Sequence, residues 1–194
     1  MTTIVILAAG SSSRMGQPKQ NLVYEDKTLL QRIAEQAKLV TDHVLVILGA
    51  GKEVIIPTLQ HLEEVITIDN AQWVEGTGSS IRLAIEYLLT QNNADQVLFT
   101  LCDQPYVNAE LLKNLITTAE ISGHGIIACH YSNTIGVPAL FNKKYFPALL
   151  ELQGQEGAKK LFEQYADDVQ TIPFPQGAID IDTEEDFRKL KSGR

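Results

Sequence analysis

The sequence of 194 residues predicts an α/β protein in which a mainly parallel sheet carries helices on both faces. Short apolar runs rich in β-branched residues alternate along the chain with longer segments whose apolar residues recur at the helical period of 3.6. Strands joined through helices in this way need right-handed crossovers, which make the strands parallel and give a three-layer α/β/α arrangement. The length fits one domain, 1–194, and neither an internal repeat nor a low-complexity linker divides it.

The predicted strands are apolar runs bounded by Gly, Asn, Asp or His, and they cover residues 3–7, 43–48, 65–68, 96–101 and 125–129. Helical periodicity predicts helices at 29–40, 81–88 and 111–119. The third of these would begin near Asn108, and Thr183 with Asp186 marks the start of a final helix at 184–191. Beyond Gly136 the pattern weakens, and short helical pieces predict a smaller elaboration packed beside the sheet.

Composition narrows the class of protein. The formal net charge is -8, which argues against a nucleic-acid-binding surface, because such surfaces depend on clustered Lys and Arg. No apolar run approaches the ~20 residues that span a bilayer, and no basic region precedes the first apolar run, so we expect neither membrane insertion nor secretion. Cys102 and Cys129 lie in apolar runs and are expected to be free, buried thiols, as in a cytoplasmic protein.

The segment from Ile4 to Lys19 carries the clearest functional signal. A predicted buried strand leads into a turn of small residues, Ala8-Ala9-Gly10-Ser11-Ser12-Ser13-Arg14-Met15-Gly16. Such a turn presents backbone N–H groups as donors, and its small side chains let a phosphate or a base approach closely. Arg14 and Lys19 supply positive charge, so the segment predicts a nucleoside triphosphate site.

Two familiar phosphate-binding loops do not match this segment. A P-loop has four residues between its glycines and then Lys followed by Ser or Thr, whereas here five residues separate Gly10 from Gly16 and Gln20 follows Lys19. A dinucleotide-binding fold needs an acidic residue at the end of its second strand, and that strand here ends in Gly49.

Other polar or glycine-rich segments follow the predicted strands: Gly49-Ala50-Gly51, Asp69-Asn70 and Asp103-Gln104-Pro105. The carboxyl ends of parallel strands meet at one edge of a sheet, so these segments and the first loop should share one mouth. A carboxylate held there, that of Asp103, suits Mg²⁺, although an Asp that merely opens a turn is the simpler alternative. In Asp180-Ile181-Asp182 the alternation of a short strand would put both carboxylates on one side. Capping of the last helix is the alternative role for Asp182.

The segments Leu7-Ala8-Ala9-Gly10, Ser13-Arg14-Met15-Gly16 and Lys19 resemble the signature of the nucleotidyltransferases that modify molybdenum cofactor, the MobA-like NTP transferase family. Ala9 and Asp103-Gln104-Pro105 are more similar to the cytidylyltransferase branch, because the guanylyl branch usually has Gly and Asp-Met-Pro at these positions. The resemblance continues through 76–82, 136–141, 154–161 and 180–187. It implies a Rossmann-like nucleotidyltransferase fold.

The resemblance also implies an activity, the Mg²⁺-dependent transfer of CMP from CTP to the terminal phosphate of molybdopterin, with release of pyrophosphate. It assigns catalytic roles to Arg14, Lys19 and Asp103, and metal binding to Asp103 and Asp180, with Asp182 as the alternative to Asp180. Ser79 and Ser80 become contacts to base or ribose, although capping of a helix remains open for both. The expected nucleotide-binding set is Leu7, Ala8, Ala9, Gly10, Ser11, Ser12, Arg14, Lys19, Gly49, Ser79, Ser80 and Asp103.

Two alternatives stay open at the level of sequence. The acceptor could be a sugar phosphate or another small phosphate, with the same chemistry. In a different class, the protein could be a non-catalytic maturation factor that binds the cofactor and a molybdenum hydroxylase. For a molybdenum cofactor cytidylyltransferase we expect a monomer whose partners are CTP or another nucleoside triphosphate, molybdopterin and, transiently, a molybdenum hydroxylase or its maturation factor. The sequence leaves the choice between CTP, GTP and ATP open.

Overall fold

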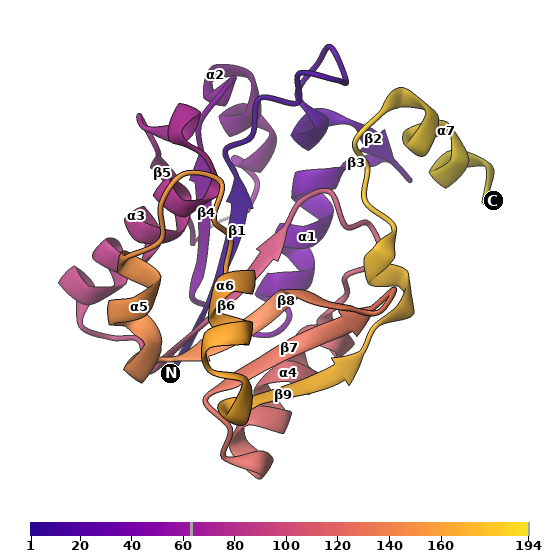
Figure 1. Ribbon diagram of the computed structural model, residues 1–194. Helices are drawn as coiled ribbons and strands as arrows, with labels where there is room; N and C mark the ends of the chain where they lie inside the picture. The colour runs from indigo at the N-terminus through magenta and orange to yellow at the C-terminus, as the bar shows by residue number, and fades with distance from the viewer. Residues whose placement is uncertain (63, 194) are drawn as a thin grey trace.

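A seven-stranded sheet forms the centre of the molecule in a computed structural model, which describes residues 1–62 and 64–193 of the predicted domain (Figure 1). The strand order is β5-β4-β1-β6-β8-β7-β9. The strands are β1 Thr2–Ala8, β4 Val44–Leu48, β5 Val65–Asp69, β6 Gln96–Leu101, β7 Ile126–Tyr131, β8 Thr134–Asn142 and β9 Val169–Pro173. A separate antiparallel pair consists of β2 Val23–Tyr24 and β3 Lys27–Thr28. Since β1 pairs in parallel with both β4 and β6, the prediction of a mainly parallel sheet is confirmed.

The alternating side chains of β1 separate two layers of core. Val5 and Leu7 point into a cluster formed with α3 Thr77–Gln91, α5 Phe146–Leu150 and α6 Lys159–Gln164. Ile4 and Ile6 point the other way, toward α1 Leu29–Lys38, α2 Lys52–Ile55 and α4 Ala109–Ser122. Figure 1 shows the two sets of helices on opposite faces of the sheet, which confirms the three-layer prediction.

The helix starts follow from capping residues. Thr28 caps α1 in a capping box with Gln31, and the side chain of Asn108 accepts a hydrogen bond from the Leu111 N–H at the start of α4. The predicted last helix is α7, Glu184–Ser192, where Thr183 and Asp186 form a second capping box. Each of these side chains satisfies backbone N–H groups that the first turn of a helix leaves without partners.

β8 and β9 were not predicted, because the weak pattern beyond Gly136 indicated only a smaller elaboration. β8 lies between β6 and β7 and runs antiparallel to both. Gly136 and Pro138 obscure it, since proline cannot donate to a ladder and glycine weakens a strand pattern. Both residues sit at an irregularity in the pairing, where the register shifts between Ala128 and Cys129 of β7. This bulge lets a strand that contains proline pass through the interior of a sheet.

Two further expectations concern local features. Cys102 and Cys129 are both buried and free, as predicted. The expected short strand at 180–182 does not form, and a single backbone hydrogen bond of 3.0 Å from Ile181 N–H to the Asp103 carbonyl ties this segment to the end of β6. Within the described part of the chain, no helix combines the length and the apolar character needed to cross a membrane.

Candidate functional site

The loop after β1 and the turn after β6 meet at the mouth expected from the sequence, around a pocket of about 550 Å³. Lys19 Nζ lies 2.5 Å from Asp103 Oδ2 and 3.0 Å from Asp182 Oδ1. Arg14 approaches from the solvent side, with Nη1 3.2 Å from Asp182 Oδ2. Two cations from the first loop therefore face two carboxylates from segments that are distant in sequence.

A glutamine that the sequence analysis did not select holds the first loop in shape. Gln20 is buried, and its Nε2 donates to the carbonyls of Ala8 at 2.7 Å and Gly10 at 3.1 Å. Ser12 Oγ accepts from the backbone N–H of Lys19 at 3.0 Å, which closes the loop on itself. These bonds fix the path from β1 to Lys19, so the lysine reaches the mouth without being part of the sheet.

Lys19 stays protonated in this environment. Burial by itself would lower the pKa of its ammonium, but the adjacent Asp103 carboxylate outweighs that effect, Asp182 adds to it, and the pKa rises above its ordinary value. The side chains of Lys19 and Asp103 are only 16% and 13% exposed, so water screens the pair weakly. The ammonium thus acts as a fixed positive charge between the two carboxylates.

The structure distinguishes the two candidate carboxylates of the C-terminal segment. Asp182 lines the pocket and contacts Lys19 and Arg14, whereas Asp180, which we favoured on the resemblance, is exposed and lies outside the pocket lining. Partial desolvation and the nearby Asp182 carboxylate raise the pKa of Asp180. Ile181 is fully buried in a small cluster with Met15 and Leu22, which anchors the segment so that Asp182 reaches the mouth. On geometry, Asp182 is the better candidate ligand.

The two serines at the start of α3 differ in position. Both Oγ atoms accept a hydrogen bond from Asn70 Nδ2, at 2.8 Å for Ser79 and 2.9 Å for Ser80. Ser79 Oγ also donates to the Gly76 carbonyl at 2.8 Å, which consumes its capacity within the protein. Ser80 lines the pocket and Ser79 does not. The buried Asn70 thus organises the turn that presents Ser80.

Of the twelve predicted nucleotide-binding residues, the pocket lining contains Leu7, Ala8, Ala9, Gly10, Ser11, Arg14, Lys19, Ser80 and Asp103. Ser12, Gly49 and Ser79 lie behind it and shape the described loops instead. Asp182, the alternative metal ligand, lines the pocket as well, and so do residues with no predicted role in the site: Gln20, Trp73, Val74, Gly76, Thr77, Leu101, Cys102 and Gln155. Trp73 both packs on the core and faces the pocket. No periodic pattern marks these positions in the sequence.

Gly49 has a packing role that its place at the mouth concealed. A Cβ at this position would lie 2.6 Å from the Trp73 Cβ and 2.7 Å from the Ala9 carbonyl oxygen. We expect Gly49→Ala to lower the free energy of unfolding by ~1–3 kcal/mol, the usual cost of overpacking, with a fall in Tm of about 2–4 °C per kcal/mol. Thermal unfolding measures this. Gly157→Ala is the matched control, because a Cβ there meets open space, and an equal loss in both variants would contradict the argument.

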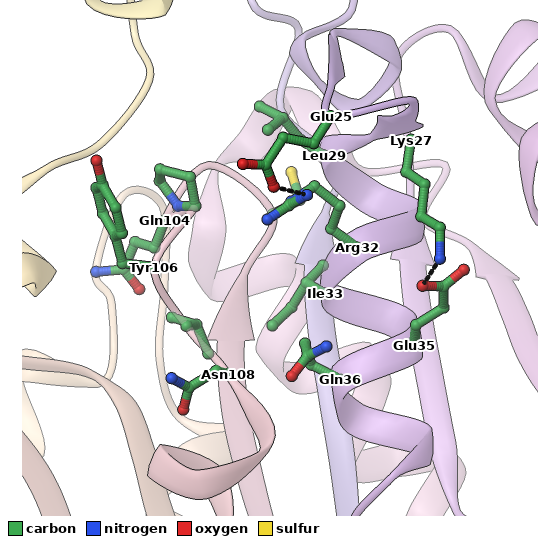
Figure 2. A pocket seen from close by; sticks show the side chains of 13 residues that line it. Glu25, Lys27, Leu29, Arg32, Ile33, Glu35, Gln36, Gln104, Tyr106 and Asn108 are labelled. Carbon is green, nitrogen blue, oxygen red and sulfur yellow. Dashed lines mark hydrogen bonds and ion pairs between the residues drawn. The ribbon is translucent and has the colours of Figure 1, made fainter. Parts of the chain in front are cut away.

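Two other hollows border the site. One, of about 510 Å³, lies behind the Asp103 turn, between α1 and residues 104–108 (Figure 2). Its charges are paired within the protein, Arg32 with Glu25 and Lys27 with Glu35, so the described residues of its lining offer no free cation for phosphate. The other, of about 350 Å³, has a mostly apolar lining. It shares Leu7, Thr77 and Leu101 with the pocket of about 550 Å³ at the mouth, which we call the nucleotide pocket after the ligand that the sequence predicts. A ligand in this second hollow would lie directly beside a bound nucleotide.

The donor set fits a divalent cation that arrives with a triphosphate. Asp103 Oδ1 is buried and has no hydrogen-bond partner among the described residues, which leaves a lone pair available at the mouth. The described residues contain no group of three or more His, Cys, Asp or Glu arranged to hold a metal ion. Mg²⁺ commonly uses only one or two carboxylates, and phosphate oxygens and water complete its shell. Burial raises the pKa of the Cys102 thiol to about 12, so its neutral sulfur adds no thiolate ligand.

The chain is similar to known proteins along most of its length. A family model for the MobA-like NTP transferase domain matches residues 4–169. The bifunctional protein GlmU of Francisella tularensis subsp. holarctica (strain OSU18) is 31% identical over 165 residues, and the match covers 84% of this chain and 35% of that protein. The chain therefore spans about a third of the length of such curated relatives.

Among solved structures, a homologue of Mycobacterium tuberculosis Rv0371c from Mycobacterium sp. strain JC1 is 30% identical, with a TM-score of 0.83 over 99% of this chain and 96% of that one. Rv0371c itself, in a complex with manganese, is 26% identical, with a TM-score of 0.79 over 100% of this chain and 99% of that one. The family model begins on β1 and includes both the first loop and Asp103. By this match, the chain belongs to the MobA-like NTP transferase family.

Proposed function

We propose that this protein is a divalent-metal-dependent nucleotidyltransferase that transfers CMP from CTP to the terminal phosphate of molybdopterin and releases pyrophosphate. The observation that carries the proposal is the convergence of Lys19, Asp103 and Asp182 at one end of the small-residue loop. A protein that only binds a cofactor has no need for two carboxylates held by one mostly buried lysine at the mouth of such a pocket. Family membership supports the reaction class.

In the proposed reaction, an oxygen of the acceptor phosphate forms a bond to the α-phosphorus of CTP while the bond between that phosphorus and the bridging oxygen to the β-phosphate breaks. A phosphate monoester is largely ionised near neutral pH, since its second pKa is about 6, so no side chain needs to remove a proton. The task of the protein is to align two anions and to reduce their repulsion. Lys19 and Arg14 do this from the first loop, together with its backbone N–H groups.

Asp103 and Asp182 are the residues we propose to hold the metal, in place of Asp103 with Asp180. A bound divalent cation would neutralise phosphate charge and polarise phosphoryl oxygens. The manganese complex of Rv0371c supports a divalent cation in a protein similar to this chain. Mg²⁺ is the ion we propose, because hard oxygen ligands and a phosphate partner suit it.

The choice of CTP and molybdopterin rests on the sequence resemblance at Ala9 and at Asp103-Gln104-Pro105. One observation favours a second acceptor class. The curated relative described above is a GlmU protein and carries no molybdenum-related name, so a sugar phosphate or another small phosphate stays a candidate for the same chemistry. We propose a monomer that acts in the cytosol, where the two free thiols, Cys102 and Cys129, remain reduced.

The deciding experiment measures pyrophosphate release with each of the four nucleoside triphosphates and Mg²⁺, in the presence of molybdopterin or a sugar phosphate. We expect CTP with molybdopterin to give the fastest release. Release with a sugar phosphate alone would change the acceptor and leave the reaction class intact. Absence of release with every pair, together with tight binding to a molybdenum hydroxylase apoprotein, would support the maturation factor instead.

Removal of the metal gives a separate prediction. Chelation with EDTA should abolish pyrophosphate release, because Lys19 and Arg14 alone leave most of the triphosphate charge uncompensated. Addition of Mg²⁺ or Mn²⁺ in excess of the chelator should restore it. Thermal unfolding without nucleotide should change little with EDTA, because Lys19 already neutralises the carboxylates. Activity that survives chelation would contradict the metal-dependent mechanism.

A further inference from the structure

Residues 152–158, which we call the rim loop, form part of the wall of both the nucleotide pocket and the apolar hollow. Gln155 lines the nucleotide pocket. Gly157 and Ala158 line the apolar hollow, which lies on the side of the nucleotide pocket formed by Leu7 and Leu101. The loop joins α5 to α6, and its two ends are anchored by Leu152 and Ala158, which are buried in the core cluster with Val5 and Leu7. The position of residues 153–157 between these anchors depends on contacts with other segments.

An ion pair from another part of the chain provides those contacts. Arg82 of α3 binds Glu75 in two places, with Nη1 2.8 Å from Oε1 and Nη2 2.6 Å from Oε2. Arg82 Nη1 also donates to the Leu152 carbonyl at 2.5 Å, and Glu75 Oε1 accepts from the Gly154 N–H at 3.1 Å. The ion pair thus holds the beginning of the rim loop at two backbone groups.

Close backbone approach adds a second, independent contact. The Gly78 N–H donates to the Gly154 carbonyl at 3.0 Å. A Cβ at Gly76 would lie 2.5 Å from the Gly154 oxygen, and a Cβ at Gly78 would lie 3.0 Å from the carbonyl carbon of Gln153. The rim loop therefore packs against a backbone that has no side chains to hold it away. This contact forms beside Trp73, Val74 and Thr77, which line the nucleotide pocket.

Arg82 and Glu75 both stay ionised near neutral pH, as an ion pair that holds the rim loop requires. The Arg82 guanidinium and the Gly154 N–H hold the pKa of Glu75 at about 2, and the Glu75 carboxylate raises the pKa of Arg82. Both groups stay charged across the physiological range, so the contact does not depend on pH there. Arg82 is 20% exposed and lies outside the lining of the nucleotide pocket, so its cation points to the loop and not to phosphate.

We propose that Arg82 and Glu75 are positioning residues, which fix the rim loop so that one rigid wall serves the nucleotide and the acceptor together. This inference rests on the proposed function for its acceptor half only. When the pair is broken, both ligands must order the loop on binding, and this weakens both. Because neither residue touches the reacting phosphates, the rate constant at saturation should suffer less than the two binding steps.

The test compares Arg82→Gln with Arg82→Lys, Glu75→Gln and a matched control, Arg188→Gln, which breaks an exposed ion pair with Glu184 on α7. The first readout is amide hydrogen exchange without ligands. In Arg82→Gln we expect faster exchange in residues 153–157 and at Gly78, whose N–H binds the loop. Arg82→Lys should restore part of the protection, since lysine can reach one acceptor but not form the paired contact. The control should match the wild type.

The second readout is binding of CTP with Mg²⁺, followed by the fluorescence of Trp73, the single tryptophan of the chain. For Arg82→Gln we expect the Kd for CTP and the KM for molybdopterin to rise about tenfold each, with a change in kcat of less than about threefold. Glu75→Gln should give smaller changes in the same direction, because an amide oxygen can still accept from Gly154.

Three outcomes would overturn the inference: unchanged exchange in the rim loop, faster exchange with unchanged Kd and KM, or a loss confined to kcat. A fall in Tm without faster exchange in the loop would also count against it, because that indicates general destabilisation. Failure of the proposed function can be distinguished from failure of this inference. If no acceptor supports transfer, the exchange and CTP-binding results still decide whether the pair fixes the wall of the nucleotide pocket.

Discussion

Replacement of Asp103 by asparagine is expected to lower the rate of nucleotidyl transfer by more than about a hundredfold, equivalent to ~2.7 kcal/mol of transition-state stabilisation. The side chain keeps its shape in this variant but loses the negative charge that would bind the metal. The buried Oδ1, which has no partner in the described chain, is the atom we expect to contact the cation. Steady-state pyrophosphate release at saturating CTP and Mg²⁺ measures the effect.

The neighbouring carboxylates give the matched comparison for this prediction. Asp182→Asn should also reduce the rate strongly, because Asp182 contacts both Lys19 and Arg14. Asp180→Asn is the control, since Asp180 lies two positions away in the same segment and outside the pocket lining. The proposed metal site would be wrong if Asp103→Asn kept near-normal activity. If Asp180→Asn had the larger effect of the two C-terminal variants, the original choice of ligand would stand.

Replacement of Lys19 by methionine should change activity and metal binding in opposite directions. Transfer should fall by about a hundredfold or more, since a preorganised positive charge is lost where the phosphoryl oxygens gain negative charge. Binding of Mn²⁺ without nucleotide should become tighter by about tenfold, because Asp103 and Asp182 are then left without their internal cation. Calorimetric titration with Mn²⁺ and the release assay measure the two effects.

The free energy of unfolding provides a further check on Lys19. The direction in which it changes with pH follows from the raised pKa of the lysine. A raised lysine pKa contributes stability that is fully present below the unfolded value of 10.5 and is lost only as pH rises through the higher folded value. At pH 7 the variant should therefore lose the full contribution, about 3 kcal/mol for a mostly buried pair.

Lys52→Met is the control for this variant, because Lys52 also pairs with a carboxylate at the mouth, that of Asp69, but lies outside the pocket lining. It should leave both transfer and Mn²⁺ binding nearly unchanged. Weaker Mn²⁺ binding in Lys19→Met would show that the lysine does not compete with the metal for the carboxylates.

The structure of the first half of the chain can be predicted from its sequence more completely than that of the second half. Residues 4–48 combine apolar strands, a capping residue at Thr28 and a loop of small residues, and each of these has a local physical cause. The meeting of the first loop with Asp103 follows from the parallel sheet alone, because both come from carboxyl ends of strands. Local pattern and global fold agree there.

The features that could not be predicted depend on contacts between segments distant in sequence, and no local pattern of residues marks them. β8 could not be predicted because a bulge takes up Val137 and Pro138 beside Gly136, and the pairing partners supply what the strand itself lacks. Asp182 owes its position to a buried neighbour, Ile181, and to one backbone bond from a turn almost eighty residues earlier. In the sequence Gln20 cannot be distinguished from other polar residues, because its role depends on the backbone carbonyls to which it donates.

The direction of β8 has a consequence for how the mouth is assembled. Because this strand runs against its neighbours, the chain leaves it at the opposite end of the sheet from Lys19 and has to climb back through α5 before α6 can start (Figure 1). The returning stretch between Asn142 and Val169 has its own path, separate from β1 and its loop. Insertions or deletions there would remodel the side of the entrance that the rim loop forms and leave the first loop in place, so the acceptor side can change without moving Lys19 or Arg14.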